Sequence, residues 1–464
     1  MKSVVLLYRY RPIETGLKEL QNFSIYFSPV SKLNDPIGEG EFNVYWQGDS
    51  IAWSGLLRNY ICSMFIAMEH FLLGVNRNDI QKYAAIVDIH MFDDVPMGKR
   101  LSAIQEKFLM DEKVKAWLDM VSHTNDRIYE HTLALLLTQI HGIALNIVLE
   151  QFVHDKVINQ NVLDQQREYS CKRQLPLSDF KFLVQKILNT VDDEAKKCLN
   201  NKKNAAFFVE MNSNEREKAL FDICASFPNF YVKHLQEILY PNSYIACFTG
   251  NPNNKVMWGN YAGAQQGICM IYETDDKNRI SLTDKDDHTH NDYLIEQVLY
   301  DDNLEEDNFF ELLGMLNPEQ LFSWLTAPDG EKSDILNCYY PEKQKWRDRY
   351  WGIFHKRFFR KATGWSYEQE SRVVIADLFL NQGNDEGKLL KVDSKNVYGV
   401  ILGMKVEKGR KKEIIKRVIE LRKDERFKNF KIFQEDKKLD GELYPREMAI
   451  YPELEKIMDD AEGR

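Results

Sequence analysis

Two glutamates and an arginine occupy alternate positions in the stretch GWSYEQESRVVI, residues 364–375. Such strict alternation is typical of a β-strand, in which successive side chains point to opposite faces. Glu368, Glu370 and Arg372 would then share one face, where a fixed carboxylate can stabilise the positive charge that builds on a sugar as a glycosidic bond breaks. The plainer alternative is a half-exposed strand with a charged, solvated face. The chemical interpretation makes Glu368 and Glu370 candidate catalytic residues and Arg372 a candidate cofactor-binding residue.

A pair of arginines lies near the N-terminus in YRYR, residues 8–11. In a strand, Arg9 and Arg11 share a face, and guanidinium groups bind phosphates through two parallel hydrogen bonds. An edge strand with a charged exterior is the alternative. Ser28 ends the next predicted strand, FSIYFS, where its hydroxyl would either orient a sugar or cap the following turn. If these residues form one pocket, we expect a candidate carboxylate to lie within reach of Arg9 or Arg11.

Residues 247–273, CFTGNPNNKVMWGNYAGAQQGICMIYE, combine glycines with large aromatic residues. Trp258 and Tyr261 lie three residues apart among these glycines, which indicates either backbone close to a ligand or a tight aromatic turn packed on the core. The segment fits neither the dinucleotide-binding fingerprint nor the P-loop. The spacing of the histidines and cysteines predicts no metal site. Trp258 and Tyr261 are therefore candidate cofactor-binding residues.

The composition narrows the class of protein. A chain of 464 residues exceeds the size of a usual single core, so two folding units are expected, and 44% hydrophobic residues are enough to fill them. The net charge of −10 argues against a general nucleic-acid-binding protein. Seven cysteines without a C-x-x-C pair predict reduced thiols and a cytoplasmic location. The charge-free segment between Glu130 and Glu150 predicts a buried helix rather than a membrane span, so the protein is expected to be soluble.

The elements that must position these residues are unevenly distributed along the chain. Helical spacing dominates residues 50–240, and β-spacing is confined to the two ends. We therefore predict an α+β fold in which one mixed sheet is built from N-terminal and C-terminal segments, with a large helical insertion. Near the C-terminus, VYGVILGM, a basic helix and FKIFQ predict a parallel strand–helix–strand crossover. The predicted strands of the sheet lie near residues 4–10, 24–28, 244–249, 267–273 and 366–375. The predicted domains are a core of residues 1–49 and 244–464 and a helical insertion of residues 50–243.

Several of these motifs, taken in order, resemble the bacterial family catalogued as domain of unknown function 2971. They are Y-R-Y-R, I-Y-F-S before L-N-D-P, C-F-T before M-W-G-N-Y-A and G-I-C, W-S-Y-E-Q-E-S-R, and V-I-L-G, over residues 4–45 and 244–405. This chain has Asn260 where the family often has histidine, which removes a proton-transfer role from that position. The resemblance implies no agreed activity.

The order of an early basic residue, a serine-containing strand and a late glutamate is also similar to the layout of ADP-ribosyltransferase folds. That similarity implies NAD as the substrate. An arginine would hold the pyrophosphate and Ser28 the ribose, while Trp258 or Tyr261 would hold the ring.

Three functions remain open from the sequence. The first is an NAD-utilising, ADP-ribosyltransferase-like enzyme or toxin effector of a bacterial conflict or antiphage defence system. The second is a non-catalytic ligand sensor, whose helical block would bind a protein partner. The third is a metal-dependent nuclease with Asp35, Glu368 and Glu370 as ligands and Lys361 nearby. The acidic chain opposes the third, because it would repel nucleic acid unless a partner supplied positive charge.

Overall fold

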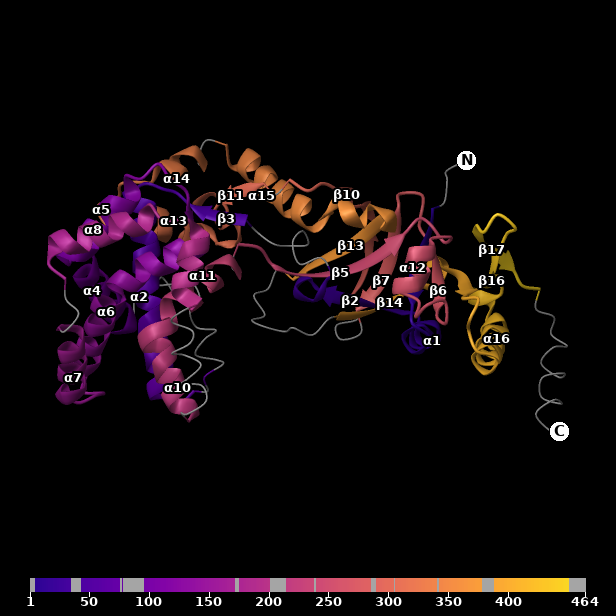
Figure 1. Ribbon diagram of the computed structural model, residues 1–464, viewed down its shortest axis with the longest axis horizontal. Helices are drawn as coiled ribbons and strands as arrows, with labels where there is room; N and C mark the ends of the chain where they lie inside the picture. The colour runs from indigo at the N-terminus through magenta and orange to yellow at the C-terminus, as the bar shows by residue number, and fades with distance from the viewer. Residues whose placement is uncertain are drawn as a thin grey trace. The chain divides into compact units, whose positions relative to one another are not determined.

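The computed structural model describes most of the chain, and the fold is a mixed α+β fold with a large mixed sheet and a helical region (Figure 1). The described residues are 5–34, 43–75, 77, 96–171, 175–200, 214–237, 239–284, 289–303, 305–339, 342–377 and 388–449. The chain forms two compact units. The sheet unit comprises Met1–Glu41, Asn242–Asn303 and His355–Arg464, and the helical unit comprises Phe42–Pro241 and Leu304–Phe354.

The sheet unit is organised around a twelve-stranded sheet with the order β17-β16-β15-β6-β1-β5-β2-β14-β7-β8, in which β13 also pairs with β5 and with β9. Its strands are β1 (Leu6–Arg11), β2 (Ser24–Pro29), β5 (Asn242–Thr249), β6 (Ile268–Glu273), β7 (Arg279–Asp284), β8 (His290–Leu294), β9 (Glu296–Gln297), β13 (Glu370–Asp377), β14 (Lys388–Val392), β15 (Val397–Leu402), β16 (Lys431–Lys437) and β17 (Leu443–Glu447). The sheet therefore contains strands from both ends of the chain, as predicted.

In the part of this unit that the structure describes, three α-helices accompany the sheet: α1 (Ile13–Asn22), α12 (Lys255–Asn260) and α16 (Lys408–Arg422). α16 connects β15 to β16, which are parallel, so the predicted crossover is confirmed. Ile414, Val418 and Leu421 of α16 are buried in the core, which explains why a helix so rich in lysine and arginine is stable. A short two-stranded sheet joins β10 (Leu299–Tyr300) to β12 (Arg360–Lys361).

The helical unit has one continuous hydrophobic core. Its helices are α2 (Ser50–Leu72), α4 (Pro96–Met110), α5 (Glu112–Ser122), α6 (Glu130–His154), α7 (Gln160–Cys171), α8 (Leu177–Leu188), α10 (Glu215–Phe221), α11 (Phe227–Glu237), α13 (Pro318–Leu325), α14 (Asp334–Tyr339) and most of α15 (Lys343–Phe358). A small sheet of β3 (Asn43–Trp46), β4 (Ile128–Tyr129) and β11 (Glu306–Asn308) belongs to it as well.

Two helices of this unit, α2 and α6, are long and apolar enough to cross a membrane by length and composition. Most of each apolar window is buried inside the protein, as in the core helices of many soluble proteins. α6 contains the charge-free segment, and its leucines and isoleucines pack in the core, as the sequence predicts.

Two boundaries differ from the sequence-based prediction. Residues 304–354, assigned to the core domain, belong to the helical unit. The predicted strand over 364–375 is only partly a strand, because Thr363–Glu368 form a 3₁₀ helix and β13 begins at Glu370. Gln369 between them adopts the left-handed conformation, with φ 46° and ψ 50°. The β-branched residues that favour a strand occur only from Val373 onward, whereas the alternation alone extends further.

Gly55 in α2 sits directly against the backbone of α13, and a Cβ atom there would lie 2.0 Å from the carbonyl oxygen of Trp324. We expect Gly55→Ala to destabilise the protein by about 1–3 kcal/mol, because one of the two helices must move. Urea unfolding of the full-length protein measures the change. Gly352→Ala on α15 is the matched control, since nothing lies within 4 Å of its Cβ position. The control is expected to be neutral or stabilising by up to ~1 kcal/mol, and equal losses in both variants would contradict the packing argument.

Candidate active site

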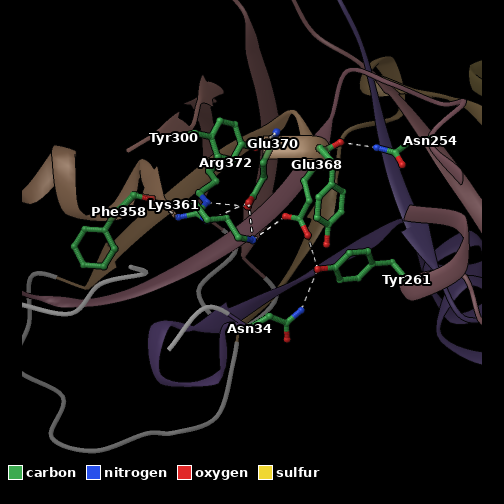
Figure 2. Close-up of polar contacts among 10 residues, drawn as sticks. Asn34, Asn254, Tyr261, Tyr300, Phe358, Lys361, Glu368, Glu370 and Arg372 are labelled. Atoms are coloured by element: carbon green, nitrogen blue, oxygen red, sulfur yellow. Dashed lines mark hydrogen bonds and ion pairs between the residues drawn. The ribbon is translucent and has the colours of Figure 1, made fainter. Parts of the chain in front are cut away.

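Short secondary-structure elements bring the candidate catalytic residues together in the sheet unit. β13 runs antiparallel to β5 and pairs Glu370 with Thr249 and Arg372 with Cys247, so these four side chains share one face of the sheet. The 3₁₀ helix before β13 ends at Glu368, and the left-handed Gln369 turns the chain between the two glutamates. Both carboxyl groups therefore reach the same small volume although they lie on either side of a turn (Figure 2).

Glu370 is held in a rigid ion pair with Arg372. The Nε and Nη2 atoms of Arg372 donate to the two carboxylate oxygens at 2.8 and 3.1 Å, and Nη1 donates to the carbonyl of Phe358 at 2.6 Å. The backbone amide of Glu370 donates to the hydroxyl of Tyr300 at 2.7 Å. Arg372 is fully buried, and such a bidentate pair is the strong form of this interaction.

Lys361 joins the two carboxylates. Its Nζ donates to Glu368 at 2.7 Å and to Glu370 at 3.2 Å, and it lies 4.8 Å from the centre of the Trp365 ring. β12 pairs with β10 and places Lys361 at this point. Lys361, Glu368 and Glu370 are each at most 4% exposed, so their charges interact with little screening by solvent.

Tyr261 connects Glu368 to the half-exposed edge of the cluster. Its hydroxyl donates to Glu368 at 2.6 Å and accepts from the side-chain amide of Asn34 at 3.2 Å. Tyr261 follows α12, whose first turn is capped by Asn254, and the same Asn254 side chain donates to the carbonyl of Tyr367. The M-W-G-N-Y turn and the 3₁₀ helix are thus fastened together around Glu368 (Figure 2).

The two carboxyl groups differ in proton affinity. Burial raises the pKa of both, but for Glu370 the charge and hydrogen bonds of Arg372, followed by the charge of Lys361, outweigh burial and lower its pKa to about 2. For Glu368, burial outweighs the hydrogen bonds from Lys361 and Tyr261 and keeps its pKa above the ordinary value. Two neighbouring carboxyl groups with separated pKa values are the usual basis for distinct acid and base roles. Of the two carboxyl groups, Glu370 is the stronger acid and Glu368 the weaker.

A divalent metal between these glutamates does not fit the geometry. The ammonium group of Lys361 already occupies the position between the two carboxylates, and Arg372 takes both oxygens of Glu370. Within the described parts of the chain, no group of three or more histidine, cysteine or acidic residues is arranged to hold a metal ion. Asp35, the third ligand of the nuclease hypothesis, lies outside the described residues.

The two N-terminal arginines do not join this cluster, contrary to the expectation of one pocket. Tyr8 and Glu370 both pair with Thr249, so the side chains of Tyr8 and Glu370 lie on the same face of the sheet. Arg9 follows Tyr8 in the strand, so its side chain lies on the opposite face. There, Arg9 and Arg11 both lie beside Glu19 of α1. The expectation failed because the sequence does not show which face of the sheet the arginines of β1 and the glutamates around β13 will each occupy.

Two other predicted site residues, Trp258 and Ser28, make contacts that stabilise the fold. Trp258 is fully buried; its ring packs edge-on against Tyr10 at 5.0 Å, and its indole N–H donates to the carbonyl of Pro252. It therefore packs in the core and shapes the turn that carries Tyr261. Ser28 lies on β2 opposite Ile245, and its hydroxyl donates to the carbonyl of Pro29 at 3.3 Å.

Lys361, which the sequence placed near the glutamates only under the nuclease hypothesis, is the member of the cluster whose contacts with both carboxylates were not predicted. It appears in the sequence only as a lysine seven residues before Glu368, and its place depends on a two-residue strand. Asn34 and Tyr300 were likewise missed, since each comes from a different short segment and contributes one hydrogen bond. The order E-x-E-x-R was a sufficient signal for Glu368, Glu370 and Arg372, and the glycine-rich aromatic segment was the signal for Tyr261.

Comparison with known proteins gives one family and no characterised relative. No curated protein and no solved structure matches the chain significantly. The N-terminal part of the predicted family resemblance has no counterpart in the match that is found. Residues 257–373 are similar to the family described as "Protein of unknown function (DUF2971)", and this range begins at the turn that carries Tyr261 and ends just after Arg372.

Proposed function

We propose that this protein is an enzyme that breaks the bond between nicotinamide and ribose in NAD, with Glu368 as the group that acts on the substrate. The observation that carries the proposal is the chain of contacts Tyr261–Glu368–Lys361–Glu370, in which one carboxyl group has a raised pKa and the other a lowered one. Two such carboxyl groups suit a reaction that develops positive charge on a sugar and then releases a proton.

The proposed reaction needs no external oxidant or reductant. The C–N bond breaks with its electron pair leaving on nicotinamide, and the positive charge that remains on the ribose is stabilised by ionised Glu368. Water or an acceptor then attacks the same carbon, and the proton it loses passes to Glu368, assisted by the hydroxyl of Tyr261. Glu370 acts as a positioning residue, since its ionised carboxylate holds Lys361 against Glu368. Arg9 and Arg11 lie on the other face and do not hold the pyrophosphate of this NAD.

The remaining parts of the proposal concern the biological setting. We include a cytoplasmic role as an effector in a bacterial conflict or antiviral defence system, with ADP-ribosyl transfer as one outcome of the reaction. We also include a protein partner bound through the helical unit. Both rest on the combination of a small enzyme-like unit with a large helical unit.

A second candidate is a non-catalytic sensor. All four charges of the cluster are paired and buried, as they are in ion networks that serve only to hold a fold. A sensor would bind NAD, or another ligand, without turning it over.

Nicotinamide release from NAD by the wild type and by Glu368→Gln separates these candidates. The amide keeps the size of the side chain and removes its charge, so we expect turnover to fall about a hundredfold or more with a smaller change in KM. Glu407→Gln, an exposed position before α16, is the matched control and should keep full activity. Unchanged turnover in Glu368→Gln would remove this carboxyl group from the mechanism. NAD binding without turnover in the wild type would favour the sensor, and Mg²⁺-dependent cleavage of nucleic acid would favour the nuclease.

A further inference from the structure

The opposite face of the sheet holds a buried guanidinium group with unused donors. Arg9 is 5% exposed, and only its Nη2 atom makes a hydrogen bond among the described residues, at 2.7 Å to the carbonyl of Tyr26. The Nε and Nη1 atoms are buried and have no hydrogen-bond partner there. The guanidinium also lies 5.5 Å from the centre of the Phe248 ring, which covers one flat side but accepts no hydrogen bond.

Among the described residues, the charges around Arg9 do not balance. Glu19 is the carboxylate beside it, with Oε1 3.6 Å from Arg9 Nε, but Glu19 also accepts from Arg11 Nε at 2.9 Å and from the hydroxyl of Tyr272. Two arginines therefore share one carboxylate. Arginine stays protonated in proteins, so the surplus positive charge cannot be removed by titration. A buried charge without a counter-charge is costly, and a bound anion removes that cost.

The residues around Arg9 add to the positive potential and are partly exposed to solvent. The side chain of Arg11 is 22% exposed, so this cluster is open to solvent at its edge. α16 lies beside α1, to which Arg410 and Arg417 donate hydrogen bonds. Helix α16 carries seven lysines and arginines against two glutamates, a balance that attracts anions to this side of the unit.

We infer that Arg9 and Arg11 form a binding site for a small tetrahedral oxyanion of the phosphate type. Guanidinium groups bind phosphate oxygens through charge-assisted hydrogen bonds, and Arg9 Nη1, which has no hydrogen-bond partner among the described residues, would donate one of them. The anion balances the second arginine while Glu19 balances the first. The site is separate from the candidate active site, because Arg9 and Glu370 project from opposite faces of the sheet.

Isothermal titration with inorganic phosphate, at constant ionic strength set with chloride, tests this site. We expect saturable binding to the wild type and to Glu368→Gln. In Arg11→Gln we expect affinity about tenfold weaker or worse, the usual consequence of losing a charge-assisted contact. Lys412→Gln, an exposed position on α16, is the control for general electrostatic attraction and should change affinity little.

Parallel titrations with ADP and with lipid vesicles identify the kind of molecule that supplies the phosphate group. Tighter binding of ADP than of phosphate identifies a nucleotide, and binding only to vesicles of phosphatidylglycerol identifies a lipid headgroup. Because Arg9→Gln could fail to fold, Arg11→Gln carries the test, and circular dichroism confirms that this variant is folded. Absence of saturable binding of all three ligands to the wild type, or equal affinity in folded Arg11→Gln and the wild type, would overturn the site.

Discussion

Replacing Arg372 by methionine is expected to destabilise the sheet unit by about 3–5 kcal/mol, the usual loss when one partner of a buried ion pair is removed. The methionine fills much of the same volume but supplies none of the hydrogen bonds to Glu370 and to the carbonyl of Phe358. The lowered pKa of Glu370 depends first on Arg372 among the groups that oppose burial, so its pKa should rise in the variant. Urea unfolding of the full-length protein measures the loss.

A double replacement distinguishes the lost charge from the lost volume. Arg372→Met combined with Glu370→Met removes both charges, and we expect it to recover most of the stability lost in the single variant, since no unpaired charge remains buried. If the double variant is as unstable as the sum of its single variants, the pair does not act as a unit. Nicotinamide release in the double variant then shows whether Glu368 needs Glu370 to hold Lys361 in place.

Glu435 on β16 is expected to make the protein less stable as the pH rises from about 4.5 to about 8. Its side chain is 1% exposed, and neither carboxyl oxygen has a hydrogen-bond partner among the described residues. Burial, assisted by the charge of Asp436, raises the pKa of Glu435 from 4.5 to about 8. The unfolded chain loses this proton first, so the folded state binds more protons within that window. Stability is therefore fully present below the unfolded pKa and falls with pH by about 1.4 kcal/mol per unit.

The loss of stability should be complete once the pH exceeds the pKa of Glu435 in the folded protein, about 8. Glu435→Gln removes the ionisable group, so its unfolding free energy should be nearly flat over the same range. Above pH 8 it should exceed that of the wild type, by about 5 kcal/mol at most. Glu442→Gln, at an exposed position in the following turn, should keep the wild-type slope. A slope that persists in Glu435→Gln would assign the pH dependence to another group.

The placement of strands at both ends of the chain was predictable, because β-branched runs and turn residues mark each strand independently of its partners. The charge-free segment in α6 was predicted to be buried, but its length and composition also suit a membrane span, so its packing in the core is what distinguishes the two. The assignment of residues 304–354 to the core domain was wrong. These helices follow a long polar stretch, and nothing in their sequence shows which of the two hydrophobic cores they pack against. Contacts between distant segments decide that question.

The candidate site was predicted in part. Glu368, Glu370 and Arg372 do lie together, although a 3₁₀ turn and a left-handed Gln369 replace half of the predicted strand. The alternating pattern did not reveal this turn, because a continuous strand and a 3₁₀ helix followed by a turn both bring the two glutamates to the same side. The pairing of Arg9 and Arg11 with Glu19 was missed, since it requires α1 to fold back over β1.

The order of strands in the sheet has a consequence for synthesis on the ribosome. β1 pairs with β5 and β6, and β2 pairs with β5 and β14, so among the described residues neither N-terminal strand has a partner in its own half of the chain. At roughly 5–20 residues per second, these strands wait on the order of ten seconds or more before β5 leaves the ribosome. Most of the helical unit is translated during that interval, and its local contacts form quickly. The nascent chain must therefore keep two unpaired strands from aggregating, and its yield should depend on chaperones that bind extended N-terminal segments.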